Sequence, residues 1–208
     1  MTDLISLLCA TDDNYAPYCG IMLTSLFESN RNSRFKVYVF ADGDISKAHR
    51  RKFDDLGRKY GQRIAWMTID ESKIEAFPTT NHHITRPTYY RLLAAELLPQ
   101  DLERIIYLDC DLLVVGDIKP LWEVDLAGKA LACIANSSER IAERLDYPIS
   151  DGYFNAGVLT LNLQYWRDNG VGAKLIEYSM NSGSDLQLLD QDILNGVLHA
   201  EKVSMPAR

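Results

Sequence analysis

The chain of 208 residues lacks several features that would place it in other protein classes. No apolar run approaches the roughly 18 residues that a membrane-spanning helix requires. The first apolar stretch, residues 4–10, follows an aspartate rather than the basic region of a signal peptide, so it is expected to be a strand. Basic charge is also scarce. The 22 lysines and arginines against 29 acidic residues give a net charge of −7, which argues against nucleic acid as the main partner.

Cysteine is sparse and unpaired in the sequence. None of the four cysteines belongs to a Cys-x-x-Cys pair, which argues against both a zinc site and a disulfide framework. The four are Cys9, Cys19, Cys110 and Cys133. Because they lie mostly in apolar runs, we expect buried free thiols in a protein of the reducing cytoplasm.

The apolar patterning predicts strands that alternate with helices. With 47% hydrophobic residues the chain is long enough for one α/β core, and we expect a single domain over residues 1–208. Strands are expected at 4–11, 35–41, 63–69, 104–108 with an extension at 112–115, 131–135 and 158–163. Helices are expected after the turn at 12–14, with Tyr15 on its buried face, and at 46–60, 87–98, 165–181 and 187–198. This order predicts a mainly parallel sheet with helices on both faces, and a loop at 71–86 that could reach over a site.

The densest basic stretch, residues 47–63, is interleaved with two aspartates at helical spacing. Such a run is typical of a solvated helix face, and binding to a membrane or an acidic partner is the alternative.

The most informative motif is Asp109-x-Asp111, which follows the apolar run 104–108 and precedes a second one. On an extended chain residues i and i+2 point to the same side, so the two carboxylates are expected to aim together at the C-terminal end of the strand. Two adjacent carboxylates repel, and without a cation the pKa of one would rise. The pair therefore favours a hard-oxygen site for Mn²⁺ or Mg²⁺, with an ordinary turn as the alternative.

Five islands of polar sequence occur in a fixed order along the chain. They are Ala10-Thr11-Asp12-Asp13-Asn14-Tyr15, the segment from His83 to Arg91, Asp109-x-Asp111, Phe154-Asn155-Ala156-Gly157, and Asp190-Gln191-Asp192-Ile193-Leu194-Asn195. In this order and spacing the sequence resembles glycosyltransferase family 8, which includes bacterial lipopolysaccharide galactosyl- and glucosyltransferases and, more distantly, glycogenin. The resemblance runs from about residue 4 to the end of the chain.

The resemblance implies a GT-A fold, in which one Rossmann-like nucleotide-binding domain has a mixed, mainly parallel central sheet. It also implies that a hexose is transferred from UDP-glucose or UDP-galactose to a saccharide acceptor with retention at the anomeric carbon. The acceptor it implies is lipopolysaccharide or another cell-surface glycan, and the cofactor is Mn²⁺, with Mg²⁺ possible. A cytoplasmic enzyme, peripheral at the inner face of the membrane, is the location that this family suggests.

The first, second and third islands map onto the donor and the metal. Ala10, Thr11, Asp12, Asp13, Asn14 and Tyr15 resemble the uridine-binding turn, with Asp12 and Asn14 at the base or ribose. Arg91 matches an arginine near the donor, where a guanidinium suits phosphate or sugar oxygens. Asp109 and Asp111 match the metal pair, and Asp109 and Cys110 also belong to the donor site. The plain structural alternatives are a helix cap at Asp13 or Asn14 and a surface ion pair for Arg91.

The remaining islands map onto the sugar and the acceptor. Asn155, Ala156 and Gly157 resemble the donor-sugar loop, where glycine permits close backbone approach. Asp190 and Gln191 are the expected catalytic residues facing the sugar. Because helical neighbours are about 100° apart, Asp192 would instead brace the start of the helix. His83 aligns with a position on the acceptor side. A turn before a strand and a loop surface are the respective alternatives for the sugar loop and for His83.

One family segment has no counterpart in this sequence. Members usually carry a later His-x-Gly-x-x-Lys-Pro-Trp segment, which supplies a metal ligand and a phosphate-binding lysine, and His199 in His-Ala-Glu-Lys does not match it. We therefore expect a C-terminally truncated family domain that binds UDP-sugar weakly. Membrane contact would then depend on a C-terminal tail absent from this chain.

Two other functions are compatible with parts of the sequence. A nucleotide-sugar-binding module, or an inactive fragment, would keep the donor turn without catalysis. An apolar strand before Asp-x-Asp also resembles haloacid-dehalogenase-type phosphatases, with Asp109 as the nucleophile. In that class, however, the motif follows the first strand of the core, whereas here 108 residues precede Asp109.

Overall fold

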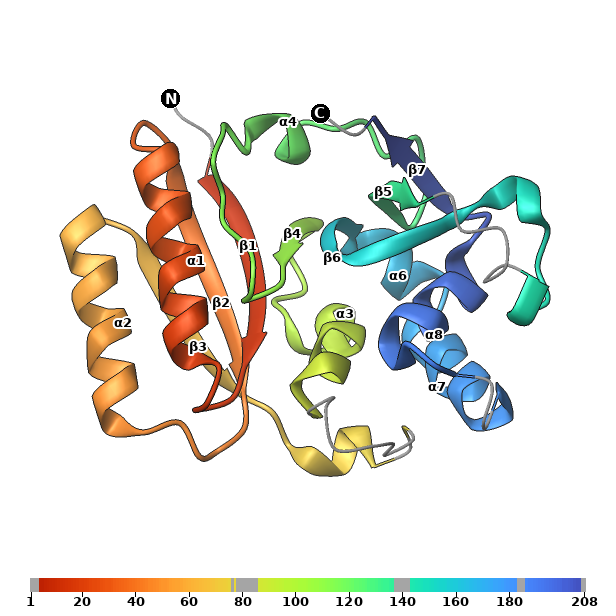
Figure 1. Ribbon diagram of the computed structural model, residues 1–208, viewed down its shortest axis with the longest axis horizontal. Coiled ribbons are helices and arrows are strands. Elements are labelled where there is room, and N and C mark those ends of the chain that lie inside the picture. The colour runs from red at the N-terminus through yellow and green to blue at the C-terminus, as the bar shows by residue number, and fades with distance from the viewer. Residues whose placement is uncertain (1–3, 76, 78–85, 137–142, 183–185, 207–208) are drawn as a thin grey trace.

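A computed structural model describes residues 4–75, 77, 86–136, 143–182 and 186–206. Its centre is a seven-stranded sheet in the order β3-β2-β1-β4-β6-β5-β7, as Figure 1 shows in part. The strands are β1 (Leu4–Thr11), β2 (Arg34–Ala41), β3 (Arg63–Thr68), β4 (Arg104–Leu108), β5 (Leu131–Asn136), β6 (Tyr153–Asn162) and β7 (Lys202–Met205). Only β6 runs against its neighbours, being antiparallel to both β4 and β5. The predicted mixed, mainly parallel sheet is confirmed.

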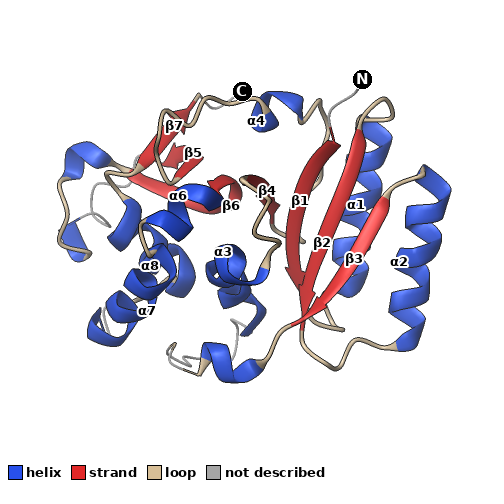
Figure 2. Cartoon of the chain, turned by 180° about the vertical axis from the view of Figure 1, so that it is seen from behind, coloured by secondary structure: helices blue, strands red, loops and turns tan. Residues whose placement is uncertain are grey.

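The strands at the centre of the sheet are apolar on both sides because helices cover both faces. In β1, Leu7 packs into the layer beneath α1 (Ala16–Ser29) and α2 (Lys47–Tyr60), whereas its neighbour Leu8 packs into the opposite layer. Figure 2 shows α1 behind β2 and β3, with α2 beside it at the β3 edge of the sheet. The largely apolar character of residues 4–11 therefore follows from burial on two faces.

The opposite face is covered by shorter segments. They are the 3₁₀ segment Arg86–Leu93, α3 (Ala94–Leu97), α6 (Leu163–Asp168), α7 (Val171–Ser182) and α8 (Leu189–Leu198). Trp166 of α6 is almost fully buried here, and its indole Nε1 donates to the carbonyl of Ala130, 3.0 Å away. Two further short helical segments, Glu71–Ile74 and Ile149–Asp151, and α4 (Lys119–Trp122) lie in the connections.

Several predicted elements differ from the structure. Residues 112–115 do not form a strand; Leu113 and Val115 are 63% and 89% exposed. The helix predicted from Pro87 is mostly 3₁₀. The helix predicted at 165–181 is two helices, separated at Gly170, where φ is +59°. Strand β7 was not predicted.

The start of α1 also differs, because Tyr15 precedes the helix and is 45% exposed rather than part of the buried stripe. Within the described residues, no helix is both long enough and apolar enough to cross a membrane.

Candidate functional site

The strand order of the sheet reverses between the neighbouring strands β1 and β4. From β1 the chain builds β2 and β3 to one side and then returns to place β4 on the other side of β1. At such a topological switch point, the carboxyl ends of neighbouring parallel strands leave a crevice that commonly binds ligands. A pocket of about 240 Å³ lies at this place. It is lined by Ala10, Thr11, Asp12, Tyr15, Pro87, Thr88, Arg91, Tyr107, Asp109, Cys110 and Asp111.

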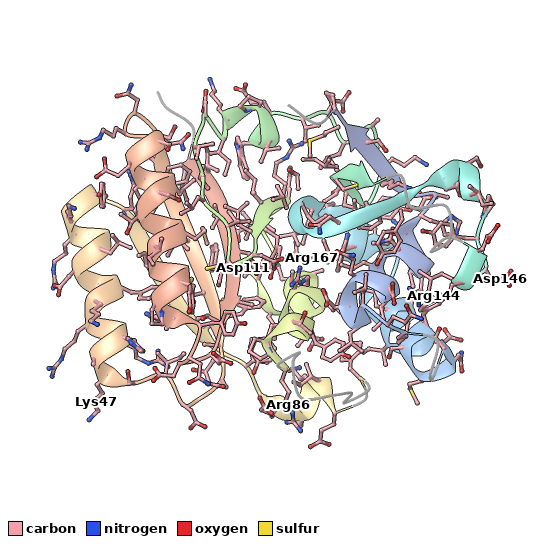
Figure 3. All side chains as sticks on the ribbon, viewed as in Figure 1. Lys47, Arg86, Asp111, Arg144, Asp146 and Arg167 are labelled. Carbon is pink, nitrogen blue, oxygen red and sulfur yellow. The ribbon has the colours of Figure 1, made fainter. Side chains whose placement is uncertain are left out.

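The two aspartates share this pocket, but not for the predicted reason. Asp109 lies just past the end of β4, and Cys110 and Asp111 form a turn, so the chain there is not extended. The turn, rather than the alternation of a strand, therefore brings both carboxylates to the pocket. Figure 3 shows Asp111 near the middle of the molecule, beside the β1–β3 part of the sheet.

Arg91 is the buried centre of the site. Its Nη2 is 2.8 Å from Asp109 Oδ1, and its Nη1 donates to the carbonyl of Ala156 at 2.7 Å. Its Nε donates to the carbonyl of Thr88 at 3.1 Å and lies 3.0 Å from Asp190 Oδ2. One guanidinium thus joins the segment 86–93 to β4, β6 and α8, which a surface ion pair could not do.

Burial and neighbouring charges shift the pKa values of Arg91 and Asp190 in opposite directions. Burial by itself would lower the pKa of Arg91, but Asp190, Tyr107 and Asp109 raise it well above its usual range. Burial raises the pKa of Asp190, and Arg91 and the hydroxyl of Thr88 oppose that rise. The contact of Asp190 Oδ2 with Arg91 lacks hydrogen-bond geometry, so this buried oxygen accepts no hydrogen bond from the described residues.

Only some residues of the first island, residues 10–15, line the pocket. Ala10, Thr11, Asp12 and Tyr15 line the pocket, and Asp12 Oδ1 also accepts from the backbone N–H of Tyr15 at 2.8 Å. Asp13 instead faces the start of α2. It accepts from the backbone N–H of Ser46 at 2.8 Å and lies 2.7 Å from His49 Nδ1, and these contacts lower its pKa. Asn14 is exposed and does not line the pocket. Donor binding by this turn stays a prediction.

The third and fourth islands pack against each other. Gly157 donates to Asn155 Oδ1 at 2.8 Å, and its carbonyl accepts from the backbone N–H of Asp109 at 2.8 Å. A Cβ at position 157 would lie 2.7 Å from Asp109 Oδ2 and 2.9 Å from Asn155 Oδ1. Glycine is therefore required for β6 to approach the carboxylate. The segment 154–157 is itself part of β6 rather than a turn before it.

The first two polar residues at the start of α8, Asp190 and Gln191, bond different segments of the chain. Asp190 Oδ1 accepts from the Thr88 hydroxyl at 2.5 Å. Gln191 Oε1 accepts from the backbone N–H of Ala156 at 2.9 Å, and Gln191 Nε2 donates to the Tyr153 hydroxyl at 2.9 Å. Both ends of the Gln191 amide are therefore fixed.

Asp192 braces the helix, as the sequence suggests. Its side chain is fully buried and accepts from the backbone N–H groups of Gln187 and Leu188, at 2.7 and 2.8 Å. It also accepts from the Tyr153 hydroxyl at 2.8 Å and from Arg144, which Figure 3 shows beside α7 and α8.

The donor set at Asp109 and Asp111 suits a hard divalent cation. Asp109 Oδ1 is occupied by Arg91 and by the Tyr107 hydroxyl, which donates at 2.8 Å, so Oδ2 is the oxygen left for a cation. Asp111 is exposed. In the described part of the chain, no group of three acidic, histidine or cysteine side chains is placed to hold a metal. A cation here would thus depend on water and ligand oxygens to complete its shell.

Four contributors to the site were given no role in the sequence analysis. Thr88 and Asn195 lie inside the second and fifth islands, and Tyr107 and Tyr153 lie in apolar strands where they look like core residues. Asn195 holds α8 against β6 by exchanging hydrogen bonds with the backbone N–H and carbonyl of Phe154, both at 2.9 Å. The predicted acceptor residue, His83, lies outside the described residues.

Comparison with known proteins identifies relatives of this chain. The family model described as glycosyl transferase family 8 matches residues 6–208. General stress protein A of Bacillus subtilis (strain 168) is 32% identical over 204 residues, which cover 95% of this chain and 70% of that protein. The lipopolysaccharide 1,2-glucosyltransferase of Escherichia coli (strain K12) is 29% identical and is matched over 99% of this chain and 61% of its own length.

Among solved structures, the galactosyltransferase LgtC in complex with donor and acceptor sugar analogs superimposes with a TM-score of 0.89 at 29% identity. The match covers 96% of this chain and 73% of that chain. This chain thus spans about three fifths of the length of the matched lipopolysaccharide glucosyltransferase.

Proposed function

Because the chain belongs to glycosyltransferase family 8, we propose that it moves a glucose or galactose from a UDP-sugar to a saccharide acceptor. We further propose that the reaction uses Mn²⁺, or alternatively Mg²⁺, and retains the configuration at the anomeric carbon. The observation that carries the proposal is the pocket at the β1–β4 switch point, where Asp109, Asp111 and Arg91 converge. Relatives named as a glucosyltransferase and a galactosyltransferase support a hexose donor.

Each part of the pocket has a role in this proposal. Asp12 and the neighbouring backbone of the β1 turn offer hydrogen bonds to a uracil or ribose, and Tyr15 offers an aromatic face. Asp109 Oδ2 and Asp111 would hold the divalent cation. A bound cation would neutralise the diphosphate and stabilise the negative charge that develops as UDP leaves.

The geometry of α8 bears on how the sugar is transferred. Asp190 is ion-paired to Arg91 and hydrogen-bonded to Thr88, and Gln191 has both ends of its amide bonded, so neither side chain is a free nucleophile. This favours departure of UDP and attack of the acceptor hydroxyl on the same face of the sugar, with the leaving phosphate oxygen accepting the proton of the acceptor hydroxyl. A hexosyl group found covalently on Asp190 or Gln191 by mass spectrometry of the reacting protein would contradict this route.

The acceptor proposed is lipopolysaccharide or another cell-surface glycan, reached from the cytoplasmic side of the membrane. The matched lipopolysaccharide glucosyltransferase supports this class of acceptor.

The proposal is tested by UDP release from UDP-glucose and UDP-galactose with Mn²⁺ and a saccharide acceptor, comparing Asp111→Asn with Asp117→Asn. Asp117 is exposed and only caps the following turn through the backbone N–H of Lys119, so it is a matched control. We expect Asp111→Asn to lower the rate about 100-fold or more, the usual cost of losing one strong electrostatic contact in a transition state, and Asp117→Asn to leave it unchanged.

Two results would point to other functions. UDP binding without release from either sugar would favour a nucleotide-sugar-binding module. Release of phosphate from a simple phosphate ester, abolished by Asp109→Asn, would favour a phosphatase.

A further inference from the structure

Three of the four cysteines converge beneath the Asp109–Asp111 turn, although they come from separate parts of the chain. Cys9 lies in β1, Cys19 in the first turns of α1, and Cys110 between the two aspartates. The sulfur atoms of Cys9 and Cys19 are 3.5 Å apart. The Cys110 side chain belongs to the same buried layer as both of them, and its thiol donates to the carbonyl of Ala10 at 3.0 Å.

The three thiols differ in how a reagent could reach them. Cys9 and Cys19 are 0% exposed, whereas Cys110 is 8% exposed and lines the pocket. A small oxidant that enters the pocket would therefore meet Cys110 first. A buried cysteine usually acts as a small apolar residue. This cluster differs because its outermost thiol opens into the candidate site and two further thiols lie directly behind it.

We propose that Cys110 is an oxidation site for small hydroperoxides, and that Cys19 resolves the oxidised thiol into a Cys19–Cys110 disulfide. Cys19 is proposed as the partner because it lies on α1, outside the sheet, whereas Cys9 is held in the central strand β1 between β2 and β4. Cys19 and Cys110 both lie in the buried layer between β1, α1 and the Asp109–Asp111 turn.

The chemistry needs only the peroxide as oxidant. The Cys110 sulfur attacks one peroxide oxygen, so that an S–O bond forms and the O–O bond breaks. Water leaves with the thiol proton when the oxidant is hydrogen peroxide, and an alcohol leaves when it is an alkyl hydroperoxide; the sulfur is oxidised to a sulfenic acid and the peroxide is reduced. The Cys19 sulfur then attacks the Cys110 sulfur, the S–S bond forms, and the hydroxyl leaves as water with the Cys19 proton. A dithiol reductant then restores the two thiols by thiol–disulfide exchange and is itself oxidised to a disulfide.

The disulfide would change the site because Cys110 stands between Asp109 and Asp111. Drawing its sulfur toward Cys19 breaks the bond to the carbonyl of Ala10 and turns the backbone that carries both carboxylates. We therefore expect a reversible loss of UDP and Mn²⁺ binding. This consequence rests on the proposed function, whereas formation of the disulfide does not.

Peptide mapping tests the disulfide independently of any activity. Trypsin leaves Cys9 and Cys19 on the peptide 1–31, Cys110 on 105–129 and Cys133 on 130–140. After treatment of the folded chain with a small excess of hydrogen peroxide, mapping without reductant should find 1–31 joined to 105–129. Cys19→Ala should abolish this species. Cys133→Ala is the matched control, because Cys133 is also buried, and burial raises its pKa to about 12.

Three mapping results would contradict the proposed disulfide. Absence of the joined species, its persistence in Cys19→Ala, or a bond confined to the peptide 1–31 would each overturn the proposal. Where the joined species forms, binding of UDP with Mn²⁺ is measured before and after oxidation. A loss that a dithiol restores, and that Cys19→Ala resists, supports a switch at the site. Unchanged binding would restrict the proposal to a thiol modification without effect on the ligand.

Discussion

At the scale of single residues, Arg91 is the side chain on which most of the site depends. Its guanidinium compensates two carboxylates and a buried carbonyl, so Arg91→Met should leave Asp190 as an uncompensated buried charge. Breaking a buried pair from one side typically costs about 3–5 kcal/mol, and we expect a loss of that size in the free energy of unfolding at pH 8. Urea denaturation measures it.

The loss should depend on pH, because Asp190 can escape it by taking up a proton. Burial raises the pKa of Asp190 in the folded chain, and removing Arg91 raises it further. The folded state then binds more protons than the unfolded state between the ordinary aspartate pKa, about 3.9, and the raised value, so stability falls as pH rises through that window. Arg91→Met should therefore recover stability as the pH is lowered toward 5. Arg86→Met, which loses only an exposed ion pair with Glu71, should show neither effect.

Gly157 is the second residue with a sharp steric role. A methyl group there would meet Asp109 Oδ2 at 2.7 Å, so Gly157→Ala should displace the carboxylate oxygen that is left for a cation. We expect Mn²⁺ binding in the presence of UDP to weaken about tenfold or more, as for a loss of about 1.4 kcal/mol. Titration followed by electron paramagnetic resonance of Mn²⁺ measures it. The control is Gly172→Ala in α7, where a Cβ meets nothing within 4 Å; equal weakening in both variants would contradict this role of Gly157.

Tyr153 is a positioning residue, because it acts on Gln191 rather than on a ligand. Its hydroxyl accepts from Gln191 Nε2 and donates to Asp192, so Tyr153→Phe frees one end of the amide. We expect kcat to fall about tenfold, with the donor KM nearly unchanged. A fall of this size corresponds to the upper end of the free energy that one hydrogen bond usually contributes. Tyr165→Phe removes a half-buried hydroxyl that is bonded to Glu201, outside the candidate site, and should leave kcat unaltered. A fall in thermal stability with unchanged kcat would make the role of Tyr153 purely structural.

At the scale of elements, α8 approaches α7 closely at Gly196, which lies against the ring of Tyr178. A Cβ on Gly196 would lie 2.1 Å from Tyr178 Cζ, so Gly196→Ala should force the tyrosine ring or the whole of α7 to move. Overpacking of this kind costs about 1–3 kcal/mol of unfolding free energy. In the double variant with Tyr178→Ala, the alanine at 196 should cost much less, which a double-mutant cycle of denaturation curves measures. Additive losses would mean that the two helices do not meet through this pair.

The elements also show which parts of the fold follow from sequence. The β1 strand was predicted to the residue because two-sided burial leaves a largely apolar segment that ends before the polar turn at Asp12. Residues 112–115 are equally apolar but are not a strand. They are held along α1 by bonds of Ser25 and Ser29 to the backbone of Val114, which no periodicity could reveal. Strand β7 is short and only half-buried, and it is defined by pairing with β5 rather than by its own pattern.

The candidate site was predictable only where a motif marks it. The aspartates, Arg91 and the polar start of α8 are motif residues, and the structure joins Asp109 and Asp190 through Arg91, with Asp111 in the same pocket as Arg91. Tyr107 and Tyr153 were missed because a tyrosine in an apolar strand looks like core until its hydroxyl is seen to bond a carboxylate.

At the scale of the whole molecule, the site is assembled from segments spread over most of the chain. The pocket combines the turn after β1, the 3₁₀ segment Arg86–Leu93 and the turn after β4, and Arg91 ties these to β6 and α8. No single segment can form this arrangement when the chain is unfolded. A ligand of the pocket should therefore bind the folded chain alone and stabilise all of it.

This coupling predicts how ligands change thermal stability. UDP at about 100 times its dissociation constant should add about 2.7 kcal/mol, which for a chain of this size raises the Tm by about 5–10 °C. The increase should require Mn²⁺ or Mg²⁺, vanish with a chelator, and be lost in Asp111→Asn but kept in Asp117→Asn, because only Asp111 lines the pocket. Differential scanning fluorimetry measures each case, with GDP in place of UDP as the test of base recognition by the β1 turn. An equal shift with GDP would assign the binding to the diphosphate and the aspartates alone, and an equal shift in both variants would remove Asp111 from the proposed metal site.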